Sequence, residues 1–332
     1  MSKSFDISHP VNRRRLLAAG GLVAVGAAAG TITVGVPDSL DPNLYSRASK
    51  IEGDSFPFHI RDATGVVQTL TEVPERIASS SYAADEALML LVDPKRVVTV
   101  TSGVDLPDIH NAYGYYPPDL MRNNGELEKL ISTRPDIVIV MDTKPAEQVK
   151  MLISAGITVI RFSFYVSFDQ VDSNLRKLAA LLGVSAKADE VLSDMWARIA
   201  RIEKAVEGVS RPRTLTYSMS GNSSARGTLN DDMIERAGAI NIANEVGRTG
   251  SVKLPQELAI SLQPEVMLLG DYRGGPSFRD FLYKSPAWKN VPAIRNRRVY
   301  LYKSTWGTTG SPFRAKAVEQ IAQLIHPERF SS

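Results

Sequence analysis

The chain has 332 residues, 43% hydrophobic and 23% charged, with a formal net charge of +3, and its length is typical of two globular domains. Four positive charges, Lys3, Arg13, Arg14 and Arg15, lie near the N-terminus with only Asp6 to balance them, so the remainder is close to neutral. A near-neutral remainder argues against binding to nucleic acid, which requires a basic face. The lack of cysteine excludes disulfides, thiolate metal sites, a cysteine nucleophile and a lipid-anchored N-terminal cysteine.

Residues 1–29 have the pattern of an export signal. Adjacent arginines precede a mildly apolar run at residues 16–29, which ends in the A-x-A-like Ala27-Ala28-Ala29. A run of about 14 residues is short for a membrane span, and paired arginines are typical of the twin-arginine route. We expect a signal peptide that is removed on export to the periplasm. The alternative is an uncleaved N-terminal membrane anchor.

The first half of the remaining sequence alternates strand and helix patterns. Residues 30–55 show no period and are interpreted as a linker, and residues 58–70 alternate around a turn at residues 62–65, which predicts a β-hairpin. Apolar, β-branched runs predict strands at residues 76–80, 96–101, 136–141 and 158–162, with helices at residues 85–92, 127–132 and 146–155. This alternation is typical of parallel βαβ units.

Two helices are expected in the middle of the chain. The first is marked by the apolar spacing of Val171, Leu175, Leu178 and Leu182 and stops at Gly183. The second spans residues 185–207, with Ser185 as the expected N-cap and Gly208 just beyond its end. One apolar stripe follows its helical period: Val191, Met195, Ile199, Ile202 and Val206. At about 1.5 Å per residue this helix is about 33 Å long, and it is interpreted either as a bridge between two similar halves or as an ordinary surface helix of one large domain.

The strand and helix alternation resumes after residue 211. It predicts strands at residues 214–219, 265–269 and 299–302 and helices at residues 233–237 and 315–325. We therefore expect an α/β fold of two Rossmann-like βα lobes bridged by a single long helix, with a ligand cleft between the lobes. The expected organisation is a signal peptide (1–29), a linker (30–55), an N-terminal lobe (56–168), linking helices including the bridging helix (169–208) and a C-terminal lobe (209–332).

One internal repeat is sharper than this general pattern. Glu128 precedes Pro135 by seven residues, and Glu257 precedes Pro264 by the same number. Each segment predicts a short helix, a turn at the proline and a buried strand, so the two glutamates occupy equivalent places in the two halves. The simpler interpretation of each glutamate is that it complements the dipole of its own helix.

Several motifs occur in a fixed order along residues 56–330. They are Val73-Pro74-Glu75-Arg76-Ile77 after the hairpin, the paired Glu-x6-Pro segments, the run from Ile234 to Ala243 (IERAGAINIA), Trp288-Lys289-Asn290-Val291-Pro292-Ala293-Ile294 followed by Arg298-Val299-Tyr300, and His326-Pro327-Glu328-Arg329-Phe330. By the order and spacing of these motifs together, rather than by any one of them, residues 56–330 resemble the substrate-binding proteins of ATP-driven importers for ferric siderophores, haem and cobalamin.

The resemblance implies a binding protein without catalytic activity or a cofactor of its own, which delivers a metal chelate to a membrane permease. In that family one glutamate on each lobe docks against basic residues of the permease, and Glu128 and Glu257 match those positions. Two carboxylates on separate lobes suit this role, because they can fix the position of the binding protein on a basic surface of the permease and attract the two proteins to each other. The expected partners are therefore an ABC permease at the inner membrane and a small metal complex. We expect a monomer.

Candidate ligand-binding residues follow the predicted strands, because ligands of open α/β sheets bind beyond the carboxyl ends of the strands. The candidates are Tyr82, Tyr165, Arg226, Tyr272, Arg273 and Trp306. Aromatic rings stack on flat ligands, and arginine forks bind carboxylate or phosphate oxygens. This combination favours an anionic, partly flat metal chelate such as a ferric siderophore, haem or cobalamin. For each aromatic residue the alternative is packing against its own lobe.

The histidines do not indicate a protein metal site. Only His59 and His110 lie outside the two termini, too few for a histidine cluster. His110 lies in a proline-rich loop with Tyr113, Tyr115 and Tyr116, and we expect an exposed loop histidine rather than an axial haem ligand. The three tyrosines either line the mouth of the cleft or pack down as a cover.

The competing function class is an enzyme. Two βα lobes with a cleft also describe glycosyltransferases acting on small anionic substrates, and Asp142 and Asp271 are available for acid–base chemistry. However, the sequence contains no G-x-G-x-x-G after the first strand, no P-loop, no G-x-S-x-G elbow and no H-E-x-x-H motif. The sequence therefore favours a binding protein over an enzyme.

Overall fold

Alternate residues of the central strands face two different layers of core. The structure is a computed structural model, and it describes residues 48–61, 65–141, 143–162, 167–272 and 274–330. In β7 (Ile137–Met141), Ile137 and Ile139 belong to one hydrophobic cluster, and Val138 and Val140 belong to another. In β13 (Val266–Gly270), Val266 and Leu268 likewise face away from Met267 and Leu269. Each strand is thus buried on both faces, as expected for parallel sheets covered by helices.

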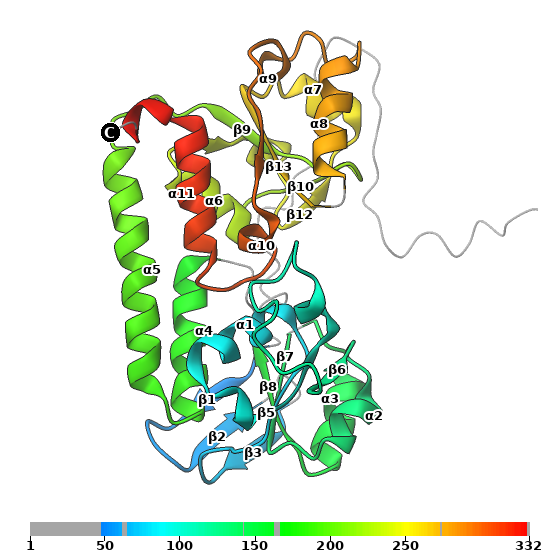
Figure 1. The fold of residues 1–332 in the computed structure, drawn as a ribbon, viewed down its shortest axis with the longest axis vertical. Helices are drawn as coiled ribbons and strands as arrows, with labels where there is room; N and C mark the ends of the chain where they lie inside the picture. Colours follow the sequence, from blue (N-terminus) through cyan, green and yellow to red (C-terminus); the bar gives the residue numbers. More distant parts are fainter. Residues whose placement is uncertain (1–47, 62–64, 142, 163–166, 273, 331–332) are drawn as a thin grey trace, which may run out of the picture. The chain divides into compact units, whose positions relative to one another are not determined.

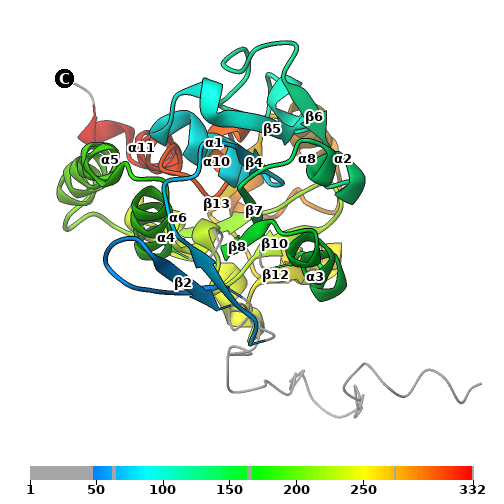
Figure 2. The ribbon, with the colours of Figure 1, turned by 90° about the horizontal axis from the view of Figure 1, so that it is seen from below.

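The N-terminal lobe contains a five-stranded parallel sheet in the order β6-β5-β4-β7-β8. Its strands are β4 (Ile77–Ser79), β5 (Val97–Thr101), β6 (Met121–Asn123), β7 and β8 (Thr158–Phe162). Helix α1 (Tyr82–Leu91) covers one face, and α2 (Leu127–Ser132) and α3 (Ala146–Ser154) cover the other, as Figure 2 shows. Apart from the short β6, these elements were predicted from the sequence pattern.

The C-terminal lobe contains a separate four-stranded parallel sheet in the order β11-β9-β13-β14. Its other strands are β9 (Arg213–Thr216), β11 (Ile240–Asn241) and β14 (Val299–Tyr302). The helices are α6 (Leu229–Arg236), α7 (Gln256–Ser261), α8 (Gly275–Lys284), α9 (Pro292–Arg295), α10 (Ser304–Gly307) and α11 (Arg314–Ile325). A small antiparallel pair, β10 (Asn222–Ser224) and β12 (Ser251–Lys253), extends beyond β9. The expectation of two separate βα lobes is therefore confirmed.

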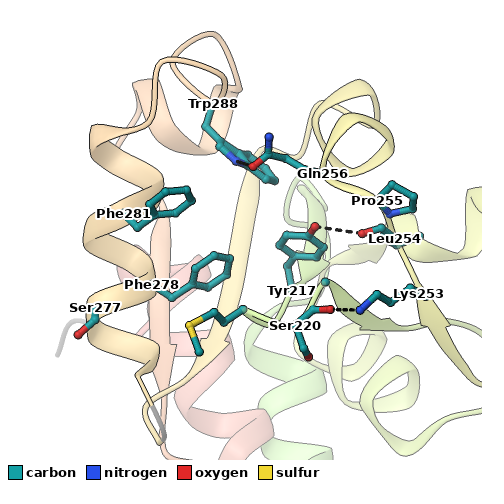
Figure 3. A pocket seen from close by; sticks show the side chains of 12 residues that line it. Tyr217, Ser220, Lys253, Leu254, Pro255, Gln256, Ser277, Phe278, Phe281 and Trp288 are labelled. Carbon is teal, nitrogen blue, oxygen red and sulfur yellow. Dashed lines mark hydrogen bonds between the residues drawn. The ribbon is translucent and has the colours of Figure 1, made fainter. Parts of the chain in front are cut away.

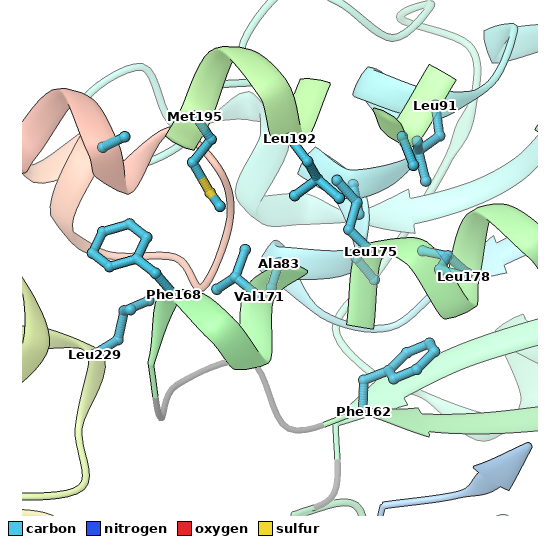
Figure 4. Close-up of a cluster of buried hydrophobic side chains, with 14 of the residues drawn as sticks. Ala83, Leu91, Phe162, Phe168, Val171, Leu175, Leu178, Leu192, Met195 and Leu229 are labelled. Carbon is cyan, nitrogen blue, oxygen red and sulfur yellow. The ribbon is translucent and has the colours of Figure 1, made fainter. Parts of the chain in front are cut away.

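Helices α4 (Phe168–Leu181) and α5 (Ser185–Ala205) connect the two lobes (Figure 1). Helix α5 contacts α1 of the N-terminal lobe and α6 and α11 of the C-terminal lobe. The predicted stripe is buried at Met195, Ile199, Ile202 and Val206. One hydrophobic cluster, part of which is drawn in Figure 4, runs from Ala83 of α1 through Leu192 of α5 to Leu229 of α6. The single long bridging helix is thus confirmed.

Helix α5 differs from the expected helix in its N-cap and in its last residue, which is Ala205 rather than residue 207. The N-cap is Val184 rather than Ser185, which forms the first residue of the helix, and no side chain caps it. The reason is that the preceding helix ends in a tight turn at Gly183, which has a φ of 70°, so the chain enters α5 one residue earlier. At the other end Gly208 also has a φ of 70°, a value that favours glycine.

The two Glu-x6-Pro segments have the same local structure in both lobes. A residue of positive φ lies just beyond the end of α2 and of α7 and directly before the proline. These residues are Arg134, with a φ of 45°, and Gln263, with a φ of 49°. The acidic residue after each proline then accepts a hydrogen bond from a backbone N–H at the start of the neighbouring strand. Asp136 Oδ2 accepts from Arg76 N at 2.8 Å, and Glu265 Oε2 accepts from Arg213 N at 2.8 Å. The two lobes therefore repeat one βα unit in this detail.

The N-terminal hairpin is confirmed, with one addition. Strands β2 (Phe58–Arg61) and β3 (Val67–Leu70) pair antiparallel, and Phe58 and Ile60 point into the core. A third strand, β1 (Lys50–Glu52), pairs with β2 and lies in the predicted linker, so the linker interpretation of residues 30–55 is wrong over these residues. The linker showed no period because β1 is only three residues long and mostly exposed.

Short 3-10 helices occupy four connections: η2 (Pro94–Arg96), η3 (Ser102–Asp105), η4 (Ile242–Val246) and η5 (Pro327–Arg329). The predicted signal peptide and most of the predicted linker lie outside the described residues. All described residues belong to one compact unit, Asp38–Ser332, so the predicted lobe boundaries at residues 168 and 208 remain predictions. Within the described part of the chain, no helix combines the length and the apolar character needed to cross a bilayer.

Candidate ligand cleft

Residues from both lobes line one small pocket of about 310 Å³. Pro107 and Asp108 come from the loop after β5, and Tyr272, Lys303 and Thr305 come from the segments after β13 and β14. Asp271 also lines it and accepts a 2.8 Å hydrogen bond from the backbone N–H of Ser304, which fixes the loop that follows β14. The pocket thus lies where the carboxyl ends of strands in the two sheets meet, the place where ligands of open α/β sheets bind.

A larger cavity of about 600 Å³ adjoins the carboxyl ends of β9, β13 and β14. We call it the serine-lined cavity, because its lining is dominated by hydroxyl and amide side chains. They are Thr216, Ser218, Ser220, Asn222, Ser223, Ser224, Asn230, Ser251, Tyr272, Tyr302 and Ser304. No arginine, lysine, aspartate or glutamate is among the described residues of this lining. The cavity therefore offers many neutral hydrogen-bonding groups over a large concave surface.

Tyr302 lies at the base of the serine-lined cavity with only 9% of its surface exposed. Burial raises the pKa of its hydroxyl, and the charge of Asp271 acts in the same direction, whereas the guanidinium of Arg314 lowers the pKa. Arg314 is itself buried and donates to Thr309 O at 2.8 Å and to Asn230 Oδ1. Arg314 thereby holds Asn230, a residue of the lining, in place.

A half-buried lysine follows β7 on the other lobe. Lys144 Nζ donates to Gly125 O at 2.9 Å, and burial lowers its pKa while the carboxylate of Glu126 raises it. Gly125 has a φ of 85° and lies so close to Lys144 that a Cβ there would be 3.2 Å from Nζ. This lysine was not among the candidates predicted from the sequence, although its place three residues beyond a predicted strand is the signal used for the other candidates.

The two lobes are joined near the cleft by a buried carboxylate. Glu86 of α1 is fully buried, and its Oε2 accepts from Thr309 Oγ1 at 2.6 Å and from Ser311 Oγ at 2.5 Å. Its Oε1 accepts from Asn111 Nδ2 at 2.9 Å, and the same Nδ2 donates to Thr305 O at 2.5 Å. Because buried charges are costly unless they are hydrogen-bonded, this network favours one arrangement of α1 against the loop between α10 and α11.

The expectation of an exposed His110 is wrong. Its side chain is fully buried, Nε2 lies 3.4 Å from Asp85 Oδ2, and the ring packs edge-on against Tyr82 with 5.3 Å between centroids. Nδ1 accepts a hydrogen bond of 3.1 Å from Ala112 N and lies 3.5 Å from Glu86 Oε1, so the ring is placed between the two carboxylates of α1. The loop folds inward because α1 presents two buried carboxylates, Asp85 and Glu86, that require donors.

The tyrosine loop both packs down and remains partly exposed. Tyr116 is buried and donates a 2.6 Å hydrogen bond to Asp85 O, whereas Tyr113 and Tyr115 are exposed. The loop therefore covers α1 through Tyr116, which agrees with the second of the two interpretations given above. None of the three lines a cavity described here.

The six predicted ligand residues are dispersed. Tyr272 lines both the serine-lined cavity and the small pocket between the lobes. Tyr82 packs against His110, and Gly103 permits its close approach, because a Cβ there would lie 2.3 Å from the ring. Arg226 is exposed, and Trp306 is half-buried, with Lys303 Nζ 5.0 Å from its ring centre. Tyr165 and Arg273 lie outside the described residues, as does Asp142, and the ligand role of all six remains a prediction.

Glu128 and Glu257 occupy equivalent, exposed positions in the first turns of α2 and α7. Neither forms an ion pair with a described residue. Among the described residues, no group of three or more histidine, cysteine, aspartate or glutamate side chains could hold a metal ion.

Two α/β lobes, a long bridging helix and cavities at the carboxyl ends of both sheets define a two-lobed binding protein of the type that holds a small ligand between its lobes. The comparison with protein families agrees: residues 77–305 match the family described as periplasmic binding protein, and the chain belongs to this family. The expected class, a substrate-binding protein of an ABC transporter, is thereby confirmed, and the membership indicates a location outside the cytoplasm.

The relatives include several binding proteins. An uncharacterised ABC transporter substrate-binding lipoprotein of Bacillus subtilis, YvrC, is 24% identical over 85% of this chain and 90% of its own length. A cobalamin-binding protein of Halobacterium salinarum is 31% identical, with 65% of this chain aligned to 59% of that protein. Both are named as binding proteins rather than enzymes.

Solved structures show the same fold. The molybdate-binding protein MolA of Haemophilus influenzae superposes with a TM-score of 0.70, at 22% identity, over 82% of this chain and 92% of its own. The haem-binding protein RhuT of Roseiflexus sp. RS-1 gives a TM-score of 0.65, at 24% identity, over 77% of this chain and 99% of its own.

Proposed function

We propose that the chain captures a metal chelate in the serine-lined cavity and delivers it, chemically unchanged, to the permease of an ABC importer. The observation that carries this proposal is the cavity of about 600 Å³ at the carboxyl ends of β9, β13 and β14, lined by hydroxyl and amide groups. Such a lining recognises a large polar ligand through many neutral hydrogen bonds and provides no acid–base pair for turnover.

The first candidate cargo is a corrinoid. A corrinoid carries several carboxamide groups, which pair with the serine hydroxyls and the amides of Asn222 and Asn230. The relatives named for cobalamin or vitamin B12, from Halobacterium salinarum and from Salmonella, support this choice.

The second candidate is an iron chelate of the siderophore type. Its hydroxamate oxygens would accept hydrogen bonds from the same hydroxyls, and a relative from Bacillus subtilis is named as an iron(3+)-hydroxamate-binding protein. If the iron chelate is anionic, Arg226 and Arg273 are the cations expected to approach it. Haem is the third chelate to be tested, since structural relatives are named for it.

A titration tests the proposal. The mature chain, residues 30–332, is titrated with cyanocobalamin, a ferric hydroxamate, haem and molybdate while its tryptophan fluorescence is followed. We expect saturable binding of one chelate at one equivalent and recovery of the unchanged ligand after unfolding of the protein. Binding of none of them would contradict the proposal, as would catalytic turnover of a nucleotide sugar by the purified chain.

We further propose that residues 1–29 direct export to the periplasm through the twin-arginine route and are then removed. Adjacent arginines before a weakly apolar run support this step. N-terminal sequencing of the exported protein tests it, with replacement of Arg13 and Arg14 by lysine as the variant expected to remain in the cytoplasm. We propose that the exported protein acts as a monomer, which light scattering measures.

A further inference from the structure

A second cavity, of about 610 Å³, lies in the C-terminal lobe, and four aromatic side chains are among the residues that line it (Figure 3). We call it the aromatic pocket. Helix α8 contributes Phe278 and Phe281 to its lining, and Tyr217 and Trp288 are the other two aromatic residues. Its size lies within the range of small-molecule sites, and its lining is apolar with a few polar groups, the combination typical of such sites.

The polar atoms of the two polar rings are turned toward the protein. The Tyr217 hydroxyl donates to Leu254 O at 3.0 Å, and Trp288 Nε1 donates to Gln256 Oε1 at 3.2 Å. The two rings lie 5.7 Å apart between centroids, tilted at 50°. Their hydrogen-bonding groups are thus paired within the protein, and both side chains are buried, so the two rings form an apolar wall of the pocket.

Two large apolar side chains at this pocket remain in water. Phe281 is 52% exposed although it stacks on Phe278 at an interplanar angle of 13°, and Met219 is 69% exposed. Both line the pocket. A flat apolar group placed in the pocket would cover part of both side chains, which the hydrophobic effect favours.

The charges near the pocket indicate the polarity of the ligand. Lys253 lines the pocket and donates to Ser220 O, and no described carboxylate lies within ion-pair distance of its ammonium group. Burial raises the pKa of the Tyr217 hydroxyl, and the charge of Glu257, which follows the lining residue Gln256 but does not itself line the pocket, acts in the same direction. The Tyr217 hydroxyl is therefore neutral, and the remaining N–H groups of Lys253 can bind a neutral acceptor oxygen on the ligand.

The aromatic pocket adjoins the serine-lined cavity, because Tyr217, Met219, Ser220 and Phe278 line both. We propose that the aromatic pocket binds a neutral aromatic ring that is an arm of the cargo, so that the cargo is a chelate carrying an aromatic side group in addition to its macrocycle or main chelating groups. The cargo part of this inference rests on the proposed function. The pocket itself can be tested without it.

The first experiment uses N-phenyl-1-naphthylamine, a neutral aromatic probe that accepts excitation energy from tryptophan. We expect one saturable site, with affinity reduced about tenfold in Phe281→Ala, the change expected when roughly 50 Å² of apolar contact is lost. Leu258→Ala is the matched control, because Leu258 is also an exposed apolar residue near the pocket but does not line it. Unsaturable binding, or equal affinity in wild type and Phe281→Ala, would overturn the aromatic site.

The second experiment compares two corrinoids, cyanocobalamin, which carries a benzimidazole base on a nucleotide arm, and dicyanocobinamide, which lacks the nucleotide. We expect Phe281→Ala to weaken binding of cyanocobalamin about tenfold and to leave binding of dicyanocobinamide unchanged. The same comparison with ferric tris-benzohydroxamate, a neutral complex whose phenyl rings do not coordinate the iron, and ferric tris-acetohydroxamate, which has no ring, covers an iron cargo. If the chelates bind but Phe281→Ala does not distinguish them, the inference that the pocket holds an aromatic arm of the cargo is wrong, and the proposed function stands. If no chelate binds while the probe does, the proposed function and the cargo arm fail and the aromatic site stands.

Discussion

Thr309 of the C-terminal lobe donates a 2.6 Å hydrogen bond to the carboxylate of Glu86 on helix α1 of the N-terminal lobe. Both residues are fully buried, and they are 223 positions apart in the sequence. Ser311 and Asn111 donate to the same carboxylate. The lobes are therefore joined by a polar contact as well as by the bridging helix.

This contact predicts a large effect of Glu86→Leu. The substitution leaves the buried hydroxyl donors of Thr309 and Ser311 without their charged acceptor and removes one acceptor of the half-buried Asn111, and we expect a loss of about 3–5 kcal/mol in the free energy of unfolding. Urea denaturation measures the change. Glu75→Leu is the control, because Glu75 is 73% exposed and forms only a 3.8 Å ion pair, and we expect a change within about 1 kcal/mol. Equal effects of the two substitutions would show that the network does not stabilise the fold.

Much of the fold could be predicted because its strands are buried on both faces. The strand predicted at residues 136–141 is observed as β7, Ile137–Met141, because five successive apolar residues leave little choice. Strand β6, Met121–Asn123, was missed, since it has three residues and only edge pairing with β5 defines it. Short elements of this kind are determined by their neighbours rather than by their own sequence.

The cavities were less predictable, because their residues lie in loops and on a helix that the sequence pattern did not predict. Tyr272 was found by its place after a strand, but Phe278 and Phe281 lie on α8, for which no helix was predicted. His110 was expected in water because its loop is rich in proline and tyrosine, and it is buried because Asp85 and Glu86 lie beneath the loop. Loop conformation depends on such long-range partners, which a single sequence does not reveal.

Buried tyrosines predict a loss of stability at high pH. Burial raises the pKa of Tyr116 and Tyr302 above the ordinary value near 10. The folded state therefore keeps these protons after the unfolded state has begun to lose them, so the contribution of the two tyrosines to stability is constant below about pH 10 and falls as the pH rises further. We expect the absorbance at 295 nm to show these two tyrosines ionising only as the protein unfolds.

Tyr116→Phe separates the two contributions of this residue. It removes the hydrogen bond to Asp85 O and is expected to cost about 1 kcal/mol at neutral pH. It also removes one titrating group, so the decline in stability above pH 10 becomes shallower. An unchanged slope would show that Tyr116 ionises normally in the folded protein.

The bridging helix predicts that both lobes unfold together. Ile199 of α5 is fully buried in the cluster that extends into both lobes. We expect Ile199→Ala to cost about 2–4 kcal/mol and to lower one calorimetric transition without splitting it. Ser193→Ala, at an exposed position of the same helix, is the control and is expected to change stability by less than about 0.5 kcal/mol. Two transitions after Ile199→Ala would show that the lobes unfold independently.

The equivalent positions of Glu128 and Glu257 predict a role in transport that is separate from ligand binding. Both are exposed in the first turns of matching helices, and neither lines a cavity described above, so charge reversal to lysine should leave the fold and the chelate affinity unchanged. If they dock against basic residues of the permease, the double reversal places like charges together, and uptake in cells should fall by at least about tenfold. Glu147→Lys is the matched control, because Glu147 is also acidic, exposed and in the first turn of a helix, α3. Uptake of the radiolabelled chelate and its equilibrium binding are measured for the same variants. A loss of affinity would place the glutamates in the cleft, and normal uptake would exclude docking through these two carboxylates.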